Sequence, residues 1–312
     1  MSSTGERYTQ AGGTSAPASL VTLDSCTFDE LYATFSAAFA DYEVQVDEAG
    51  LRRMLRRRGF DPALSFGLRM DGRLVSFTFN GIGDFAGERC AYDSGTGTLP
   101  DFRGQGLASG LFTASLPTLW HAGVRNYVLE VLQHNEAAVS VYKRLGFTTS
   151  REFSYHVQSD LGAIRPAPLR NEQVSIRTIF FEELIGSGLL PDYEPSWQNS
   201  LDSIRRSADT FILLGAFQSD RALGYALFEP ATGDVAQLLV HPEARRRGVG
   251  SALLRAMLEA NRAGLLKVIN VDARDSATLA FLSACGIPRK GMQFEMMLPL
   301  DASMDAVAGD LP

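Results

Sequence analysis

The chain has 312 residues, a net charge of −7 and a pI of about 5.2. This length is enough for two ordinary domains, each with a hydrophobic core of its own. Hydrophobic residues make up 45% and charged residues 21%, a composition typical of soluble globular proteins. The acidic excess argues against a nucleic-acid partner.

Cysteine and histidine positions argue against a metal site. Cys26, Cys90 and Cys285 are widely separated and lack paired spacing, and the four histidines are scattered. We therefore expect neither a disulfide framework nor a bound metal.

Membrane and export signals are missing from the sequence. No apolar stretch approaches the length of a membrane span, and residues 1–19 lack the apolar core of a signal peptide. We expect a cytoplasmic protein with no membrane partner and a flexible tail at 1–19. The basic run "LRRMLRRRG" at 51–59 reads first as a solvated helix face, with contact to acidic substrates or phosphates as the alternative.

The first half of the chain shows helix and strand signals in a clear order. Apolar periodicity predicts helices at 28–42 and 47–59. A hairpin with its turn at 70–73 and a strand at 88–98 come next. The predicted elements then are a helix at 106–122, a strand at 124–132, a helix at 135–145 and a closing strand at 152–158.

The second half repeats this order. Residues 159–173 contain two prolines and no periodicity, which indicates a linker. A hairpin, a strand, a long helix, a strand, a short helix and a closing strand follow, so internal duplication is the best explanation. We predict an α/β (α+β) fold with two tandem domains, each a mixed twisted sheet flanked by helices. The predicted boundaries are 1–19 (tail), 20–158 (domain), 159–173 (linker), 174–300 (domain) and 301–312 (flexible tail).

Two glycine-rich turns carry the chemical signal. "PDFRGQGLASGLF" begins at Pro100 and "PEARRRGVGSALL" at Pro242, 142 residues later. Each follows a predicted strand and opens a predicted helix, whose first backbone N–H groups are free and lie at the positive end of the helix dipole. Glycine allows close approach of an anion and arginine adds charge, so the expected ligand is a phosphate or pyrophosphate. Neither G-x-x-x-x-G-K-[ST] nor the dinucleotide pattern G-x-G-x-x-G with its acidic partner is present.

The pattern R-x-x-G-x-[GA] between a strand and an amphipathic helix resembles the pyrophosphate loop of the GNAT N-acetyltransferase superfamily. "LEVLQHNEAAVSVYKRLGF" at 129–147 is similar to a second motif of that family. The resemblance covers roughly 20–160 and 172–300. It implies acetyl-CoA as cosubstrate, a small amine as acceptor, and direct attack of the amine on the thioester.

The resemblance also implies roles for single residues. Thr96, Gly97 and Thr98 would pair with the pantetheine arm through their backbone, an N–H of this strand would polarise the thioester carbonyl, and Asn135 would contact the cofactor. Tyr142 would lie near the sulfur as general acid. The pyrophosphate would be held by Arg103, Gly104, Gln105, Gly106, Leu107 and Ala108. The matching cofactor contacts of the second half would come from Leu238, Val240, Arg245, Arg246, Arg247, Gly248, Val249 and Gly250.

Structural explanations compete with some of these roles. Asn135 and Asp275 each stand eleven residues before a glycine, so helix capping alone explains both. Glu130 and Asp93 are the first candidates for a general base, although a water chain would serve as well. Trp197 lies in an aromatic and polar stretch, and packing is the favoured reading over a role in a substrate pocket.

The second half departs from the family pattern. Leu282 stands where Tyr142 would be expected and cannot donate a proton, and Ile287 replaces the phenylalanine of Gly-Phe. We therefore expect catalysis in the N-terminal domain, in a monomer or homodimer. The alternative function is a CoA-binding regulatory or ligand-binding protein that has lost transferase activity.

Overall fold

The computed structural model describes residues 18–41, 45–168 and 174–306. Residues 1–17 of the predicted N-terminal tail, 169–173 of the predicted linker and 307–312 of the predicted C-terminal tail lie outside this range.

The N-terminal half alternates helices with β-strands. Its elements are β1 (Ser19–Thr22), α1 (Phe28–Ala38), α2 (Glu48–Arg58), β2 (Phe66–Met70), β3 (Arg73–Phe85), β4 (Glu88–Thr98), α3 (Leu107–His121), β5 (Asn126–Leu132), α4 (Glu136–Arg144) and β6 (Thr148–Gln158).

The C-terminal half repeats this order with shorter first helices. Its elements are β7 (Val174–Thr178), α5 (Phe181–Gly186), α6 (Leu201–Arg206), β8 (Ile212–Gln218), β9 (Arg221–Glu229), β10 (Asp234–Val240), α7 (Val249–Ala260), β11 (Leu266–Asp272), α8 (Ser276–Ala284) and β12 (Arg289–Pro299).

Both predicted hairpins are confirmed. β2 pairs with β3 so that Met70 lies opposite Arg73, and β8 pairs with β9 so that Gln218 lies opposite Arg221. Asp71, Gly72 and Ser219 in the two turns have positive φ angles, which two-residue hairpin turns require.

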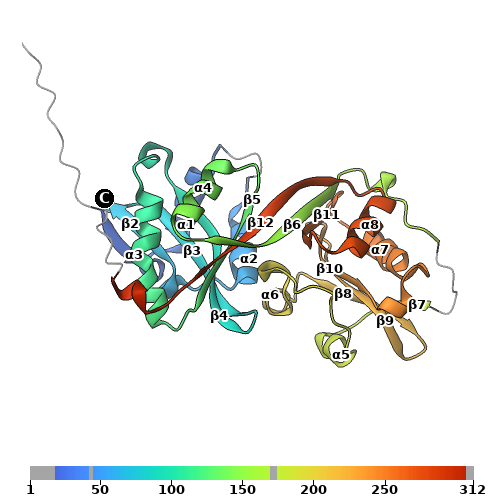
Figure 1. Cartoon of the computed structure of the whole chain (residues 1–312). Coiled ribbons are helices and arrows are strands. Elements are labelled where there is room, and N and C mark those ends of the chain that lie inside the picture. Colours follow the sequence, from blue (N-terminus) through green and yellow to red (C-terminus); the bar gives the residue numbers. More distant parts are fainter. Residues whose placement is uncertain (1–17, 42–44, 169–173, 307–312) are drawn as a thin grey trace, which may run out of the picture.

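The closing strand of each half lies beside the other half. The twelve strands form one sheet in the order β1-β2-β3-β4-β5-β12-β6-β11-β10-β9-β8-β7. β12 pairs with β5 of the N-terminal half, whereas β6 pairs with β11 of the C-terminal half. Figure 1 shows these two long strands crossing between the lobes. The two predicted sheets are therefore continuous with each other.

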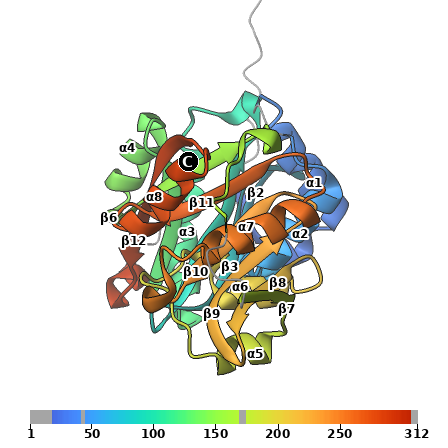
Figure 2. The same ribbon diagram turned by 90° about the vertical axis from the view of Figure 1, so that its right-hand side faces the viewer.

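Helices cover the sheet in both lobes. α1, α2 and α3 pack on strands of the N-terminal half, where Leu31, Leu51 and Leu111 are buried in one core. α7 packs on β7, β8, β9 and β10, and Figure 2 shows it lying across these strands. A separate core lies under α5 and α6 and includes Tyr225 and Leu239.

Two segments that we expected to be linker and tail are partly ordered. Ile164, which follows a 3₁₀ turn at Leu161–Ala163, is buried in the core of the C-terminal half. Residues Ala302–Ala306 form another 3₁₀ turn, in which Met304 packs against the N-terminal core. The boundaries that we expect for linker and tail stay a prediction, and the described parts of both segments carry single apolar residues that pack into a core.

Candidate functional site

The two glycine-rich turns have the same backbone shape. Gly106 and Gly248 have φ angles of 78° and 91° and stand directly before α3 and α7. Two residues earlier, Gly104 has φ 75° and Arg246 has φ 63°. Left-handed residues in such a turn direct successive N–H groups toward one point, where an anion can bind.

The first arginine of each turn is already engaged. Arg103 Nε donates to the carbonyl of Thr98 at 3.3 Å, and Arg245 Nε donates to the carbonyl of Val240 at 3.0 Å. Each also pairs with a carboxylate from the loop after the first helix of its half, Asp41 at 3.2 Å and Asp192 at 2.6 Å. These arginines therefore tie the turn to the strand end and to that loop.

Exposed cations remain in the C-terminal turn. Arg246 and Arg247 are both exposed, whereas the matching positions of the N-terminal turn hold Gly104 and Gln105. The C-terminal turn is consequently the more positive of the two.

The strand before each turn has a free edge. β4 pairs with β5 from Cys90 to Tyr92, and β10 pairs with β11 at Asp234 alone. Beyond these points the parallel strands diverge, and each outgoing strand has a bulge at the equivalent place, at Ser94 and Ala236. Among the described residues, 96–98 and 238–240 have no strand partner on the inner side, and there only the carbonyls of Thr98 and Val240 are engaged, by Arg103 and Arg245. An extended arm could pair along this edge.

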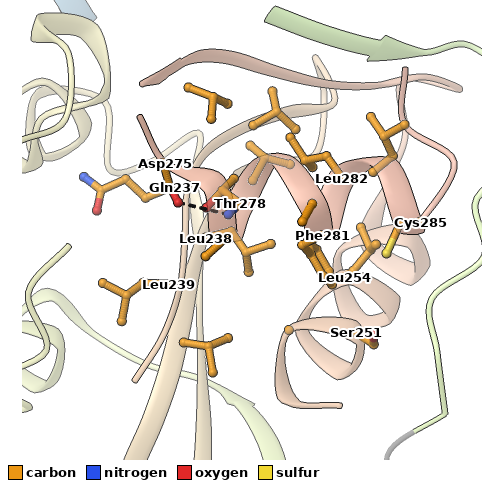
Figure 3. A pocket seen from close by; sticks show the side chains of 18 of the residues that line it. Gln237, Leu238, Leu239, Ser251, Leu254, Asp275, Thr278, Phe281, Leu282 and Cys285 are labelled. Carbon is orange, nitrogen blue, oxygen red and sulfur yellow. Dashed lines mark hydrogen bonds between the residues drawn. The ribbon is translucent and has the colours of Figure 1, made fainter. Parts of the chain in front are cut away.

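In the C-terminal half, a cavity of about 480 Å³ opens at this gap. Its walls include β10, the turn at Arg246–Gly250 and the facing sides of α7 and α8 (Figure 3). The turn therefore stands beside a space large enough for an organic ligand.

Aromatic side chains occupy the corresponding region of the N-terminal half. Phe112 and Phe147 have ring centroids 5.5 Å apart, and Tyr127 and Tyr142 lie 5.8 Å and 5.6 Å from Phe147. The C-terminal half has Leu254, Leu282 and Ile287 at the positions of Phe112, Tyr142 and Phe147.

The predicted N-terminal catalytic residues are partly brought together. The Tyr142 hydroxyl lies 3.5 Å from Asp93 Oδ2. Asp93 also accepts from the N–H of Gly95 at 2.8 Å and from the hydroxyl of Thr96 at 3.1 Å. Burial raises the pKa of the Asp93 carboxyl, although these hydrogen bonds act in the opposite direction.

Glu130 faces the junction between the halves. Its Oε2 accepts from Gln198 Nε2 at 2.8 Å, while the buried Oε1 has no hydrogen-bond partner of ordinary geometry among the described residues. Burial is the main reason that the pKa of Glu130 is raised, and the charge of Glu295, opposite it on β12, adds to the effect.

Asn135 and Asp275 act as helix caps. Asn135 Oδ1 accepts from the N–H of Ala138 at 3.2 Å, and Asp275 Oδ1 accepts from the N–H of Thr278 at 2.9 Å. The capping explanation thus accounts for both side chains, while Asp275 also lines the cavity.

Comparison with known proteins identifies the family. The model of the acetyltransferase (GNAT) family matches residues 28–147 and 175–287, which together make up most of the chain. The chain belongs to the GNAT family. The predicted α/β tandem fold and the resemblance on which it was based are thereby confirmed.

Similar sequences and structures agree with a tandem GNAT chain. A mycothiol acetyltransferase of Streptomyces coelicolor is 36% identical over 119 residues, 38% of this chain and 38% of the relative. One of Mycolicibacterium smegmatis is 52% identical over 42 residues, 12% of this chain and 14% of the relative. The matched segments thus span less than half of these relatives. A tandem GNAT protein from the clavulanic acid biosynthesis pathway has a similar fold, with a TM-score of 0.69 at 17% identity over 92% of this chain and 99% of that one.

The sequence analysis missed two cavity residues of the C-terminal GNAT half. The Tyr225 hydroxyl donates to Gln237 Oε1 at 2.7 Å, and both residues line the cavity. Burial raises the pKa of Tyr225. Tyr225 lies in a hairpin strand, outside the two glycine-rich turns and the segment 129–147. Its position at the cavity follows from the strand register, which sets it opposite Leu239.

No helix of the described GNAT chain is both long and apolar enough to cross a membrane. Over the same residues, no group of three or more His, Cys, Asp or Glu side chains is arranged to hold a metal ion.

Proposed function

We propose that the chain is an acetyl-CoA-dependent N-acetyltransferase that acts on the amine of a small molecule, and that acetyl-CoA binds in the C-terminal cavity. The observation that carries this proposal is the position of that cavity. It lies between the edge of 238–240 that has no pairing with β11 and the N–H groups that open α7. Phosphates would bind at the turn and the pantetheine arm would extend along β10.

The chain's own groups suit direct acyl transfer. A backbone N–H beyond the β10 bulge would donate to the thioester oxygen as negative charge develops there. Glu194 is an exposed residue of the cavity lining and would attract an ammonium-bearing acceptor.

Two phenols are candidates for the donor to the departing thiolate. The sequence analysis placed catalysis in the N-terminal half because Tyr142 is there, and this stays a prediction. The cavity favours the C-terminal half, where Tyr225 would donate. A CoA thiol should resemble cysteine, whose pKa of about 8.5 lies below that of tyrosine. A hydrogen bond that strengthens as the sulfur gains charge is therefore more favourable than complete proton transfer.

Replacing each phenol distinguishes these assignments. Tyr142→Phe and Tyr225→Phe are compared. The variant that lacks the true donor should lose turnover by roughly 10²–10⁴, the usual range for a general acid. Thiol release measures turnover, and acetyl-CoA titration checks that binding is retained. A loss below about threefold with intact binding would remove that tyrosine from the mechanism.

A CoA-binding protein without turnover is the second candidate. It is favoured by Leu282, an apolar side chain at the α8 position that corresponds to Tyr142. Thiol release in the presence of amines separates it from the enzyme. The names of the sequence relatives make mycothiol-related amines the first acceptors to test.

The first experiment is a calorimetric titration of the full chain with acetyl-CoA. We expect Gly250→Leu to abolish binding in the C-terminal half, since even a Cβ at Gly250 would lie 3.4 Å from Phe281 and from Val240. Ala108→Leu is the matched change in the N-terminal half. Absence of binding to the unmodified chain would overturn the proposal, and loss of binding only with Ala108→Leu would move the cofactor to the other half.

A further inference from the structure

A short segment of the chain spans the gap between β10 and β11. Asn199, at the end of the 3₁₀ turn Trp197–Asn199, accepts from Gln237 Nε2 of β10 through its carbonyl oxygen at 2.6 Å. Its side-chain Nδ2 donates to the carbonyl of Ile269 on β11 at 2.9 Å. Beyond Asp234 the described parts of these two strands do not pair with each other, so Asn199 connects them where they diverge.

The same connection reaches the proposed proton donor. Gln237 Oε1 accepts from the Tyr225 hydroxyl at 2.7 Å, and Tyr225, Gln237 and Asn199 all line the cavity. The Gln237 amide is thus fixed at both ends, by Tyr225 on one side and by Asn199 on the other. Tyr225 is 2% exposed, so Gln237 rather than bulk water sets the direction of its hydroxyl.

Arg57 of the N-terminal half holds Asn199 in place. Its guanidinium donates to Asn199 Oδ1 at 3.0 Å and to the carbonyl of Gln198 at 2.9 Å. It also pairs with Asp234 Oδ2 at 2.6 Å, and the two side chains of this pair are only 12% and 2% exposed. A planar guanidinium presents its N–H groups in a fixed fork, which suits several acceptors held in one geometry.

This use of Arg57 divides the basic run at 51–59. Arg53 and Arg56 are exposed, as expected for a solvated helix face. Arg57 instead lies between α2 and the 3₁₀ turn of the C-terminal half, with a carboxylate, an amide oxygen and a backbone carbonyl as acceptors. One charge of the run is therefore used inside the molecule, at the C-terminal cavity.

We infer that Arg57 is a positioning residue of the C-terminal site. Through Asn199 and Gln237 it fixes the direction of the Tyr225 hydroxyl, and we call this chain of contacts the relay. The inference rests on the proposed function, with Tyr225 as donor to the departing thiolate. A misplacement of about 1 Å can cost a catalytic group roughly 10²-fold in rate, so a broken relay lowers turnover more than cofactor binding.

Arg57→Lys tests the inference on the full chain. Lysine keeps a positive charge opposite Asp234 but lacks the fork that also reaches Asn199. With the amine that supports thiol release by the unmodified chain, we expect kcat to fall by roughly tenfold or more. The dissociation constant for acetyl-CoA, measured by calorimetry, should change by less than about threefold, because the relay acts on the reacting group rather than on cofactor binding.

Arg56→Lys is the matched control. Arg56 lies on the same helix and also pairs across the halves, with Asp209 at 2.7 Å, but this pair lies at the surface. It should leave kcat within about threefold of the parent, since exposed ion pairs contribute little. Asn199→Ala interrupts the relay at a second point and should lower kcat as Arg57→Lys does. Thermal melting shows which variants are folded.

A double variant separates positioning from a general loss of structure. Because Arg57 acts through Tyr225, Arg57→Lys should cost nothing further in the Tyr225→Phe chain, which lacks the positioned hydroxyl. Fluorotyrosine labelling gives a second measure that needs no acceptor amine. The fluorine NMR signal that is lost in Tyr225→Phe should shift in Arg57→Lys and stay in place in Arg56→Lys.

The outcomes separate the inference from the proposed function. An unchanged kcat or an unshifted fluorotyrosine signal in folded Arg57→Lys would overturn the inference and leave the proposed function standing. Equal losses from Arg57→Lys in the parent and in the Tyr225→Phe chain would also overturn it. If Arg57→Lys does not fold, Asn199→Ala decides by the same criteria. Absence of thiol release by the unmodified chain would overturn both.

Discussion

Arg246 in the C-terminal turn adopts a backbone conformation that favours glycine. It has a left-handed φ of 63° where the N-terminal turn has Gly104. Residues other than glycine are strained in this region, so the turn keeps a charged side chain at some cost in stability.

Replacing Arg246 in two ways isolates the backbone strain. Arg246→Gly should be more stable than Arg246→Ala by about 1 kcal/mol, because both lose the side chain and only glycine relieves the strain. Urea unfolding of the two variants measures this difference. Equal stability would show that the turn adopts another backbone conformation in solution.

Glu130 should make stability depend on pH. Its folded-state pKa is raised, so its favourable contribution is complete below the unfolded pKa of about 4.3 and is lost as pH rises through the folded value. Glu130→Gln has no proton to lose. The stability of the variant relative to the parent should therefore increase from about pH 4 upward, as measured by urea unfolding across this range.

An exposed carboxylate provides the control for this experiment. Glu88 lies on β4 and is exposed, so Glu88→Gln removes the same charge without touching the junction and is the matched variant. A parallel profile for Glu130→Gln and the parent would contradict the raised pKa. Because Glu130 is also a candidate base, thiol release is measured on the same samples.

At the level of elements, the segment Ser196–Asn199 joins the two halves. Trp197 stacks on Tyr92 with ring centroids 5.2 Å apart, and its Nε1 donates to the carbonyl of Arg58 at 2.9 Å. The next residue, Gln198, donates to Glu130, and Asn199 donates to the carbonyl of Ile269. Trp197 is 2% exposed, so the packing interpretation from the sequence agrees with its position.

Trp197→Ala should destabilise the chain by about 3–5 kcal/mol, the usual cost of removing a large buried aromatic ring. Trp197→Phe should cost less, since it keeps most of the packing and loses the hydrogen bond to Arg58. Denaturant unfolding followed by circular dichroism measures both. Trp120→Phe, at a half-buried helix position, is the control, and a cost for Trp197→Ala no larger than this control would argue against the junction.

At the level of the whole molecule, the closing strands β6 and β12 and two ion pairs connect the halves. Arg151 on β6 pairs with the buried Glu295 on β12 at 2.7 Å. Arg57 on α2 pairs with the buried Asp234 on β10 at 2.6 Å. Each half therefore completes the sheet and the polar interior of the other.

A chain cut between the halves should remain one particle. With a protease site inserted at 169–173, the two fragments should co-elute after cleavage and separate only in denaturant, because β6 and β12 stay paired across the junction. Size-exclusion chromatography with mass detection measures this. Two fragments that separate without denaturant would show that each half folds back on its own closing strand.

The sequence by itself determined the features that depend on nearby residues. Both hairpins, the glycine-rich turns and the caps at Asn135 and Asp275 could be predicted, because turn geometry and capping involve a few residues in succession. The duplication and the family followed from the same local signals at a fixed separation.

The tertiary structure alone decided which distant groups meet. No local pattern specifies that β12 crosses to β5. A free strand edge in either half offers the same backbone N–H and C=O groups for pairing. The engagement of Arg103 and Arg245 by Asp41 and Asp192 also depends on how separate loops approach. The cavity is the clearest case. Its size depends on how the side chains of β10, β11, α7 and α8 fill the space between these elements, and that space is defined only once the elements are packed together.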